Sequence, residues 1–127
     1  MSGYIGDFPT SHTAVTDPFG TFAAATGAPT ATTGFAAGDV LIYKNGNTTQ
    51  RTSSSGITVT TSFDTITGIQ MIVIDTSDDT DAGFYAAGNE YEVIVSQITA
   101  DGQTLSFPAF TFSIERAGGA LAVLKSA

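Results

Sequence analysis

The sequence predicts an all-β fold, an antiparallel sandwich of about seven short strands. Apolar side chains alternate with other residues through most of 88–115, on both sides of an Asp101-Gly102 pair, and this pattern indicates a β-hairpin. Turn residues recur about every 8 to 12 residues along the chain, as they do in sandwiches. Helical periodicity does not extend beyond a turn or two anywhere in the sequence.

The predicted hairpin contains the strongest pattern. Tyr91, Val93 and Val95 alternate with Glu92, Ile94 and Ser96 before the turn, and the alternation resumes in Phe110–Ile114 after it. Pro108 has no N–H to donate to a neighbouring strand. We therefore expect this strand to lie at a sheet edge or to carry a bulge at Pro108.

A second hairpin is predicted over residues 38–51. Asn45-Gly46 is a favoured pair for the two left-handed positions of a tight turn, and residues 40–43 form the strand before it. The strand after the turn would continue through residues 47–51.

The remaining strands are shorter or less regular. We expect strands over 57–63 and 66–75, the latter central and covered on both faces. Residues 13–22 form a plausible first strand, with Pro18 marking an edge, and residues 23–34 form a loop or a weak edge strand.

Together these elements favour a sandwich of immunoglobulin-like kind over residues 11–116. Tyr91, at a strand start, suits the tyrosine that hydrogen-bonds back to the chain in such folds. Residues 1–10 and 117–127 are expected to be apolar terminal arms outside the sandwich, either frayed or docked on a partner protein. The candidate partner-binding side chains in these arms are Tyr4, Ile5, Phe8, Leu121, Val123 and Leu124.

Composition narrows the possible functions. The 127 residues include 12 acidic and 4 basic side chains, so the net charge is −8 and no basic patch for nucleic acid or an anionic membrane is expected. The chain has no cysteine, which excludes disulfides and thiolate chemistry. Residues 1–12 lack the features of a signal peptide, and no apolar run reaches the ~20 residues of a membrane span. We therefore expect synthesis and assembly in a cytoplasm.

One stretch is unusually acidic, with four aspartates within residues 74–83. Their spacing differs from calcium loops, which place carboxylates at alternate positions and end in a bidentate Glu. The sequence therefore favours a solvated turn between strands, in which Ser77 caps a single helical turn. A weak calcium site is the alternative, and its candidate ligands are Asp75, Asp78, Asp79 and Asp81.

Other reactive side chains are sparse. His12 is the single histidine, and no acid–nucleophile pair is suggested near it. Glu90 and Glu92 are two nearby carboxylates, but glycoside hydrolysis also requires a sugar cleft and one carboxyl with a raised pKa. Their expected role is to keep a strand face soluble. No phosphate-binding loop is present, so we expect neither an enzyme nor a cofactor.

Six short motifs follow one another in a recognisable order and spacing between residues 4 and 115. They are Tyr4–Phe8, Tyr43–Gly46, Phe63–Gly68, Ile74–Ser77, Phe84–Val93 and Phe112–Glu115. In this order the motifs resemble a group of small virion proteins of tailed bacteriophages. The resemblance implies an immunoglobulin-like virion component without catalytic residues.

Among virion roles, a single sandwich with two apolar arms suits a capsid cement or decoration protein. Such a protein would bind the major capsid protein, stabilise the head and oligomerise on the particle. The alternatives are a tail, neck or fibre-associated adaptor and a carbohydrate-binding module. The last would need exposed aromatic side chains, for which the sequence offers Phe8, Phe19 and Phe35.

Overall fold

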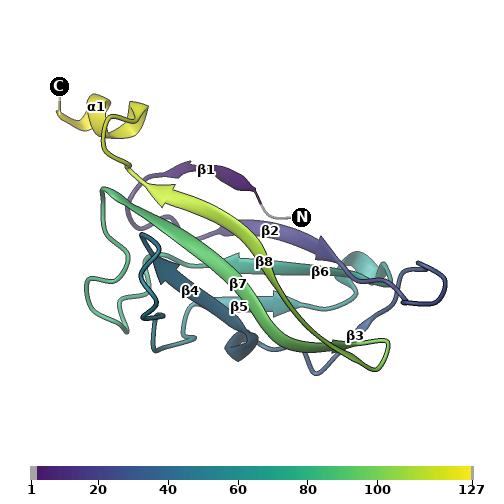
Figure 1. The fold of residues 1–127 in the computed structure, drawn as a ribbon. Helices are drawn as coiled ribbons and strands as arrows, with labels where there is room; N and C mark the ends of the chain where they lie inside the picture. Colours follow the sequence, from purple (N-terminus) through teal and green to yellow (C-terminus); the bar gives the residue numbers. More distant parts are fainter. Residues whose placement is uncertain (1–2, 127) are drawn as a thin grey trace.

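The computed structural model describes residues 3–126, and its eight strands form two packed sheets (Figure 1). This confirms the predicted all-β sandwich. The large sheet has the order β1-β8-β7-β3, with β4 also paired to β7, and the small sheet has the order β2-β6-β5. The strands of the large sheet are β1 (Tyr4–Phe8), β3 (Thr32–Thr33), β4 (Val40–Lys44), β7 (Asn89–Ala100) and β8 (Gln103–Ile114). Those of the small sheet are β2 (Val15–Gly20), β5 (Ile57–Thr60) and β6 (Ile69–Ile74).

The long hairpin of β7 and β8 forms as predicted. Asp101 and Gly102 both have positive φ, at 52° and 70°, in the turn between the two strands. Val93 is opposite Phe110, whereas Ile94 is opposite Pro108. Ala109 is therefore an extra residue on β8, and the expected irregularity at Pro108 is a β-bulge.

The core lies between the sheets, and burial alternates along β4, β6 and most of β7. Tyr91, Val93, Val95 and Phe112 are fully buried, as the alternation predicts. The Tyr91 and Phe112 rings stack with their centroids 5.1 Å apart. The Tyr91 hydroxyl donates to the carbonyl of Phe84 at 2.8 Å and accepts from the Ala86 N–H at 2.8 Å. This buried phenol therefore anchors the connection that leads into β7.

The small sheet differs from the prediction in one respect. Strand β6 is central, and β2 with Pro18 is an edge strand, both as expected. However, burial alternates along β6: Gln70, Ile72 and Ile74 are fully buried, and the residues between them are half-buried. The expectation that both faces of this strand are covered is wrong, because the small sheet packs on the large sheet through one face.

The second predicted hairpin does not form, because strand β4 pairs with a different strand from the one expected. Asn45 and Gly46 adopt the positive φ values of a tight turn, at 52° and 71°, but no strand follows over residues 47–51. Strand β4 pairs with β7 instead. The chain after the turn is rich in Thr, Ser and Gln, which offers a second strand no apolar face to bury.

The N-terminal segment belongs to the sandwich, which corrects its assignment to an arm. Strand β1 pairs in parallel with β8, so the large sheet is mixed rather than antiparallel. Its register shifts between Tyr4 and Asp7, and Gly6 adopts a φ of 142° within that shift. This irregularity removes the simple alternation by which a strand is recognised. The Asp7 carboxylate accepts from the Ser113 hydroxyl at 2.6 Å, which ties the strand to β8.

The C-terminal segment forms helix α1 (Ala120–Ser126), which extends beyond the end of β8 and away from both sheets (Figure 1). It follows a turn in which Gly118 has a φ of 76°. Two further single helical turns of 3₁₀ type lie at Ala37–Asp39 and Phe63–Thr65. Within residues 3–126 no helix has the length and apolar character needed to cross a membrane.

The core assignment can be tested at Phe112. Replacing this fully buried ring by Ala should lower the free energy of unfolding by about 3–5 kcal/mol, because it leaves a cavity between the sheets. Phe22→Ala is the matched control, since 60% of the Phe22 side chain is exposed. Urea unfolding followed by circular dichroism measures both. Equal losses in the two variants would show that the buried face has been misassigned.

Candidate functional site

Polar side chains gather at one end of the sandwich, where the chain crosses between the sheets. Residues 45–56 lead from β4 in the large sheet to β5 in the small sheet, and residues 75–88 lead back from β6 to β7. The loop of residues 9–14 crosses at the same end, where the Thr76 N–H and hydroxyl both donate to the His12 carbonyl. The acidic stretch lies in the second of these connections.

Arg51 is the centre of this region, although only 4% of it is exposed. Its guanidinium donates to the carbonyls of Ser53 at 2.6 Å and Ser55 at 2.8 Å. It also forms an ion pair with Asp78 at 2.8 Å. The charged group lies 5.0 Å from the centroid of the Tyr85 ring, within the range of a cation–π contact.

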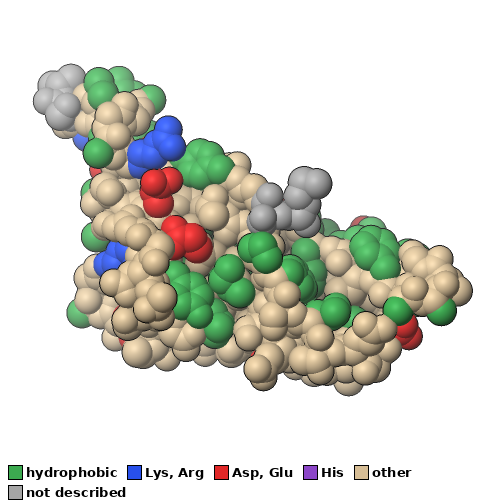
Figure 2. Space-filling view, viewed as in Figure 1, with side chains coloured by type: hydrophobic (Ala, Val, Ile, Leu, Met, Phe, Trp, Pro, Cys, Tyr) green, Lys and Arg blue, Asp and Glu red, His purple; other side chains and the backbone are tan. Residues whose placement is uncertain are grey.

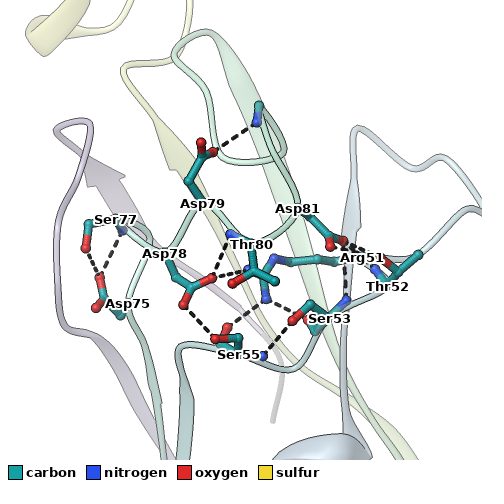
Figure 3. Close-up of polar contacts among 11 residues, drawn as sticks. Arg51, Thr52, Ser53, Ser55, Asp75, Ser77, Asp78, Asp79, Thr80 and Asp81 are labelled. Atoms are coloured by element: carbon teal, nitrogen blue, oxygen red, sulfur yellow. Dashed lines mark hydrogen bonds and ion pairs between the residues drawn. The ribbon is translucent and has the colours of Figure 1, made fainter.

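Two aspartates bind the Arg51 loop from the opposite connection (Figure 3). Asp78 accepts from Arg51, from the Ser55 hydroxyl at 2.8 Å and from the Thr80 N–H at 3.1 Å. Asp81 accepts from the Thr52 N–H at 2.6 Å and from its hydroxyl at 2.8 Å. We call these contacts, made by Arg51, Thr52, Ser53, Ser55, Asp78 and Asp81, the crossover clamp.

The other two aspartates act locally. Asp75 accepts from the N–H and hydroxyl of Ser77, and Asp79 accepts from the Gly83 N–H at 3.0 Å. The prediction that Ser77 caps a helical turn is therefore wrong. Ser77 donates to Asp75 instead, and no helical turn follows it. Figure 3 shows the carboxylates of Asp75 and Asp79 pointing away from the clamp. Within residues 3–126 no three His, Asp or Glu side chains are grouped as a metal ion would require.

The hydrogen bonds of the clamp favour the ionised form of its two carboxylates over the protonated form. The Ser55 hydroxyl, followed by Thr80 and Arg51, holds the pKa of Asp78 well below its usual range. The Thr52 hydroxyl lowers the pKa of Asp81 in the same way. Both carboxylates are therefore ionised at neutral pH and are structural acceptors rather than acids that could donate a proton.

Gly56 allows the two connections to approach closely. It has a φ of 82°, and a Cβ built at this position would lie 2.7 Å from the Cβ of Asp78. Any larger residue would push the aspartate away from Arg51. The sequence signals a turn at this glycine but gives no sign of the contact across it.

Sequence analysis missed Arg51, its neighbours Thr52, Ser53 and Ser55, and the contact of Tyr85 with Arg51. Burial raises the pKa of the Tyr85 phenol, and within residues 3–126 its hydroxyl and the Arg51 Nε atom have no hydrogen-bond partner. A single arginine in a polar stretch is usually solvated, so its burial could not be read from the pattern. The tyrosine offered a better signal, because it follows the acidic stretch beside another aromatic residue.

The other reactive residues have structural contacts. The His12 ring stacks on Phe8 with a centroid distance of 5.0 Å. Glu92 accepts from the Gly46 N–H at 2.8 Å, and the Glu90 N–H donates to the Asn45 side chain at 2.8 Å. These contacts place the two glutamates beside the β4 turn, where they hold its shape.

The two terminal segments that carry the predicted partner-binding residues lie next to each other at the end of β8. The Arg116 guanidinium lies 5.4 Å from the centroid of the Tyr4 ring, and Glu115 binds both the Thr10 N–H and the Lys125 ammonium. Ile5 and Phe8 are packed against the core, whereas 47% of Tyr4 is exposed. On helix α1, Leu121 is half-buried, and Val123 and Leu124 are 57% and 71% exposed.

The clamp predicts a specific pH dependence. An aspartate has a pKa of about 4 in the unfolded chain. A carboxyl whose pKa is lowered by folding contributes its full stabilisation above that pH, and the contribution is lost as the pH falls through the pKa of the folded state. The double variant Asp78→Asn/Asp81→Asn should therefore be less stable than wild type at pH 6, and the gap should narrow towards pH 2. Asp64→Asn, at an exposed carboxylate outside the clamp, is the control and should leave the profile unchanged. Urea unfolding at several pH values measures this, and a gap that stays constant with pH would contradict it.

Comparison of the chain with known proteins identified no relative. No family model, curated protein or solved structure matches it. Its function must therefore be inferred from its own features. These are the clamp of structural carboxylates, the projecting helix and the ordered sequence motifs.

Proposed function

We propose that the chain is a non-enzymatic structural protein of a tailed-bacteriophage virion, namely a capsid cement or decoration protein. In this role it binds the major capsid protein, stabilises the head and is present in many copies on the particle. We further propose that the sandwich is immunoglobulin-like. The Tyr91 hydroxyl supports this second point, because it binds a carbonyl a few residues upstream at the entry to a strand, as in a tyrosine corner.

The residues of the virion-protein motifs support a structural role. Asn45 and Gly46 make the β4 turn, Asp75 caps the turn after β6, and Tyr91 fills the core. Asp7, in the first motif, joins β1 to β8 through Ser113. The resemblance is therefore carried by side chains that fold the chain, as expected for a protein whose task is to be a stable part of an assembly.

The projecting C-terminal helix is the observation that carries the proposal. Leu124 is 71% exposed on α1, and an isolated leucine at the end of a short helix gains little from its own fold. Burial of such a side chain on a partner would contribute about 1.5–3 kcal/mol, part of which is lost to ordering of the segment. The segment of residues 117–127 is thus suited to dock on another protein.

Charge distinguishes this segment from the rest of the chain. Residues 116–127 contain Arg116 and Lys125, which are two of the four basic residues, and no acidic residue. Figure 2 shows hydrophobic side chains on the projecting helix, with basic and acidic side chains close beside it. The other 115 residues carry all 12 acidic side chains. Free copies would repel one another through these acidic bodies.

The N-terminal residues have a smaller part in this docking than the sequence suggested. Ile5 and Phe8 are held within the sandwich, so Tyr4 is the one N-terminal candidate with a largely exposed ring. Deletion of residues 1–9 would remove strand β1 and test folding rather than docking. The docking test is therefore made at α1.

The experiment measures co-sedimentation with undecorated phage heads and, separately, with purified tails. The variant Leu121→Ser/Leu124→Ser should bind heads at least about tenfold more weakly, which corresponds to about 1.4 kcal/mol. Deletion of residues 117–127 should abolish binding. Phe22→Ser, which changes an exposed apolar side chain in the loop after β2, should bind as wild type does.

Each outcome separates the possible functions. Binding to tails alone would replace the decoration role by that of a tail, neck or fibre-associated adaptor. Unchanged binding of heads by the double serine variant would move the contact to a sandwich face. Absence of binding to either particle would refute a virion function.

A further inference from the structure

A polar cavity lies beside the crossover clamp and has no part in the function proposed above. It has a volume of about 420 Å³ and opens to solvent. Its walls are the turn that follows β4 and the connection that enters β7. The side chains that matter for its chemistry are Lys44, Asn45, Asn47, Gln50, Phe84 and Asn89.

The cavity is held open by contacts at both ends of its walls. At one end the Asn45 amide donates to the Asn89 side chain at 2.8 Å, and the Asn45 N–H donates to the Glu90 carbonyl at 2.8 Å. At the other end the clamp joins Thr52 to Asp81, three residues before Phe84. The Phe84 N–H in turn donates to the Asp81 carbonyl at 3.0 Å. The walls are therefore fixed before any ligand arrives, which reduces the entropy lost on binding.

Two amide groups on the cavity wall are free to donate. The Asn47 side-chain oxygen accepts from the Thr49 N–H at 2.8 Å, and the Gln50 oxygen faces the Tyr43 hydroxyl at 3.4 Å. Within residues 3–126 the NH₂ groups of Asn47 and Gln50 make no hydrogen bond. Both side chains are exposed on the rim and therefore present two N–H donors each to a ligand.

The cavity also combines an aromatic ring on the β7 connection with a cation at the end of β4. The Lys44 ammonium lies 4.9 Å from the centroid of the Phe84 ring and 3.4 Å from the Gly83 carbonyl. Phe84 is half-buried against Tyr85 and Tyr91, so its ring is rigidly placed. Lys44 retains further N–H donors beside this apolar surface.

This combination selects a ligand with many hydroxyl groups and an apolar face. We propose that the cavity binds a pyranose unit of a glycan. The NH₂ groups of Asn47 and Gln50 donate to ring hydroxyls, Lys44 donates to a hydroxyl or a sugar carboxylate, and the C–H face of the sugar lies against the exposed part of Phe84. The cavity lining contains no carboxylate, so the site binds the sugar without an acid–base pair to cleave it.

This site differs from the one that the sequence suggested for a carbohydrate-binding module. Phe19 and Phe35 are buried in the core, and Phe8 packs against Phe112 at 6.2 Å between centroids. None of these three candidate rings is therefore available to form an exposed binding face. Phe84 takes this role because the clamp and the Tyr91 hydroxyl fix the connection that carries it.

The test displays the biotinylated full chain on streptavidin, so that weak single-site binding is strengthened by multivalency. The probes are arrayed oligosaccharides of neutral hexoses, N-acetylhexosamines and uronic acids. We expect binding to at least one of these groups of glycans. Gln50→Ala and Asn47→Ala should each lower the affinity about tenfold, because each removes a hydrogen-bonding partner of the sugar. Lys44→Met should weaken binding of uronic acid glycans more than binding of neutral ones.

Gln103→Ala is the matched control, because Gln103 is also an exposed glutamine but follows the β7–β8 turn. It should bind every glycan as wild type does. Amide NMR spectra of the variants establish that each is folded. Absence of binding to all arrayed glycans, or equal binding by wild type, Gln50→Ala and Asn47→Ala, would overturn the proposal. The result is independent of the virion assay, since α1 contributes no residue to the cavity.

Discussion

The buried guanidinium of Arg51 fixes the path of the chain at the end of the sandwich where connections cross between the sheets. A permanently charged group can be buried only where acceptors surround it. Here these acceptors are two carbonyls of its own loop and the Asp78 carboxylate of the opposite connection. The loop before β5 must therefore curl around the guanidinium, and the connection after β6 must bring its aspartate to the same point. Gly56 makes the approach sterically possible.

The same constraint shapes the proposed glycan site. The wall that carries Phe84 begins directly after Asp81, and the wall that carries Gln50 ends directly before Arg51. A change in the clamp would alter the distance between the walls, even though no clamp residue needs to touch a ligand. Helix α1 is held differently, because it follows a glycine turn beyond β8 and its Lys125 forms an ion pair with Glu115. The molecule thus combines a rigid end suited to a small ligand with a projecting segment suited to a protein partner.

Local patterns were sufficient to predict the elements whose side chains alternate and whose turns have distinctive residues. The β7–β8 hairpin, its Asp101-Gly102 turn and the bulge at Pro108 all form as expected. Strand β1 was missed because Gly6 and a register shift interrupt its pattern, and because a parallel partner more than 100 residues away leaves no local signal. The hairpin after β4 was predicted from a correct turn, but tertiary pairing with β7 decided the partner of that strand.

The candidate site was less predictable than the fold. The sequence favoured a structural turn for the aspartates, but it could not identify their partners, since Arg51 and Asp78 are 27 residues apart. The burial of Arg51 depends on the closure of the whole sandwich, which no local sequence pattern records. The cavity depends in turn on two connections whose relative position is set by that closure.

A double-mutant cycle between Arg51 and Asp78 tests the clamp most directly. Stability to urea at pH 7 is measured for Arg51→Met, Asp78→Asn and the double variant. The clamp predicts that each single change leaves the partner group without its counter-charge, so that the double variant loses clearly less stability than the sum of the two single losses. Losses that add to within about 0.3–0.5 kcal/mol would contradict it, because they would show that the two residues stabilise their connections independently.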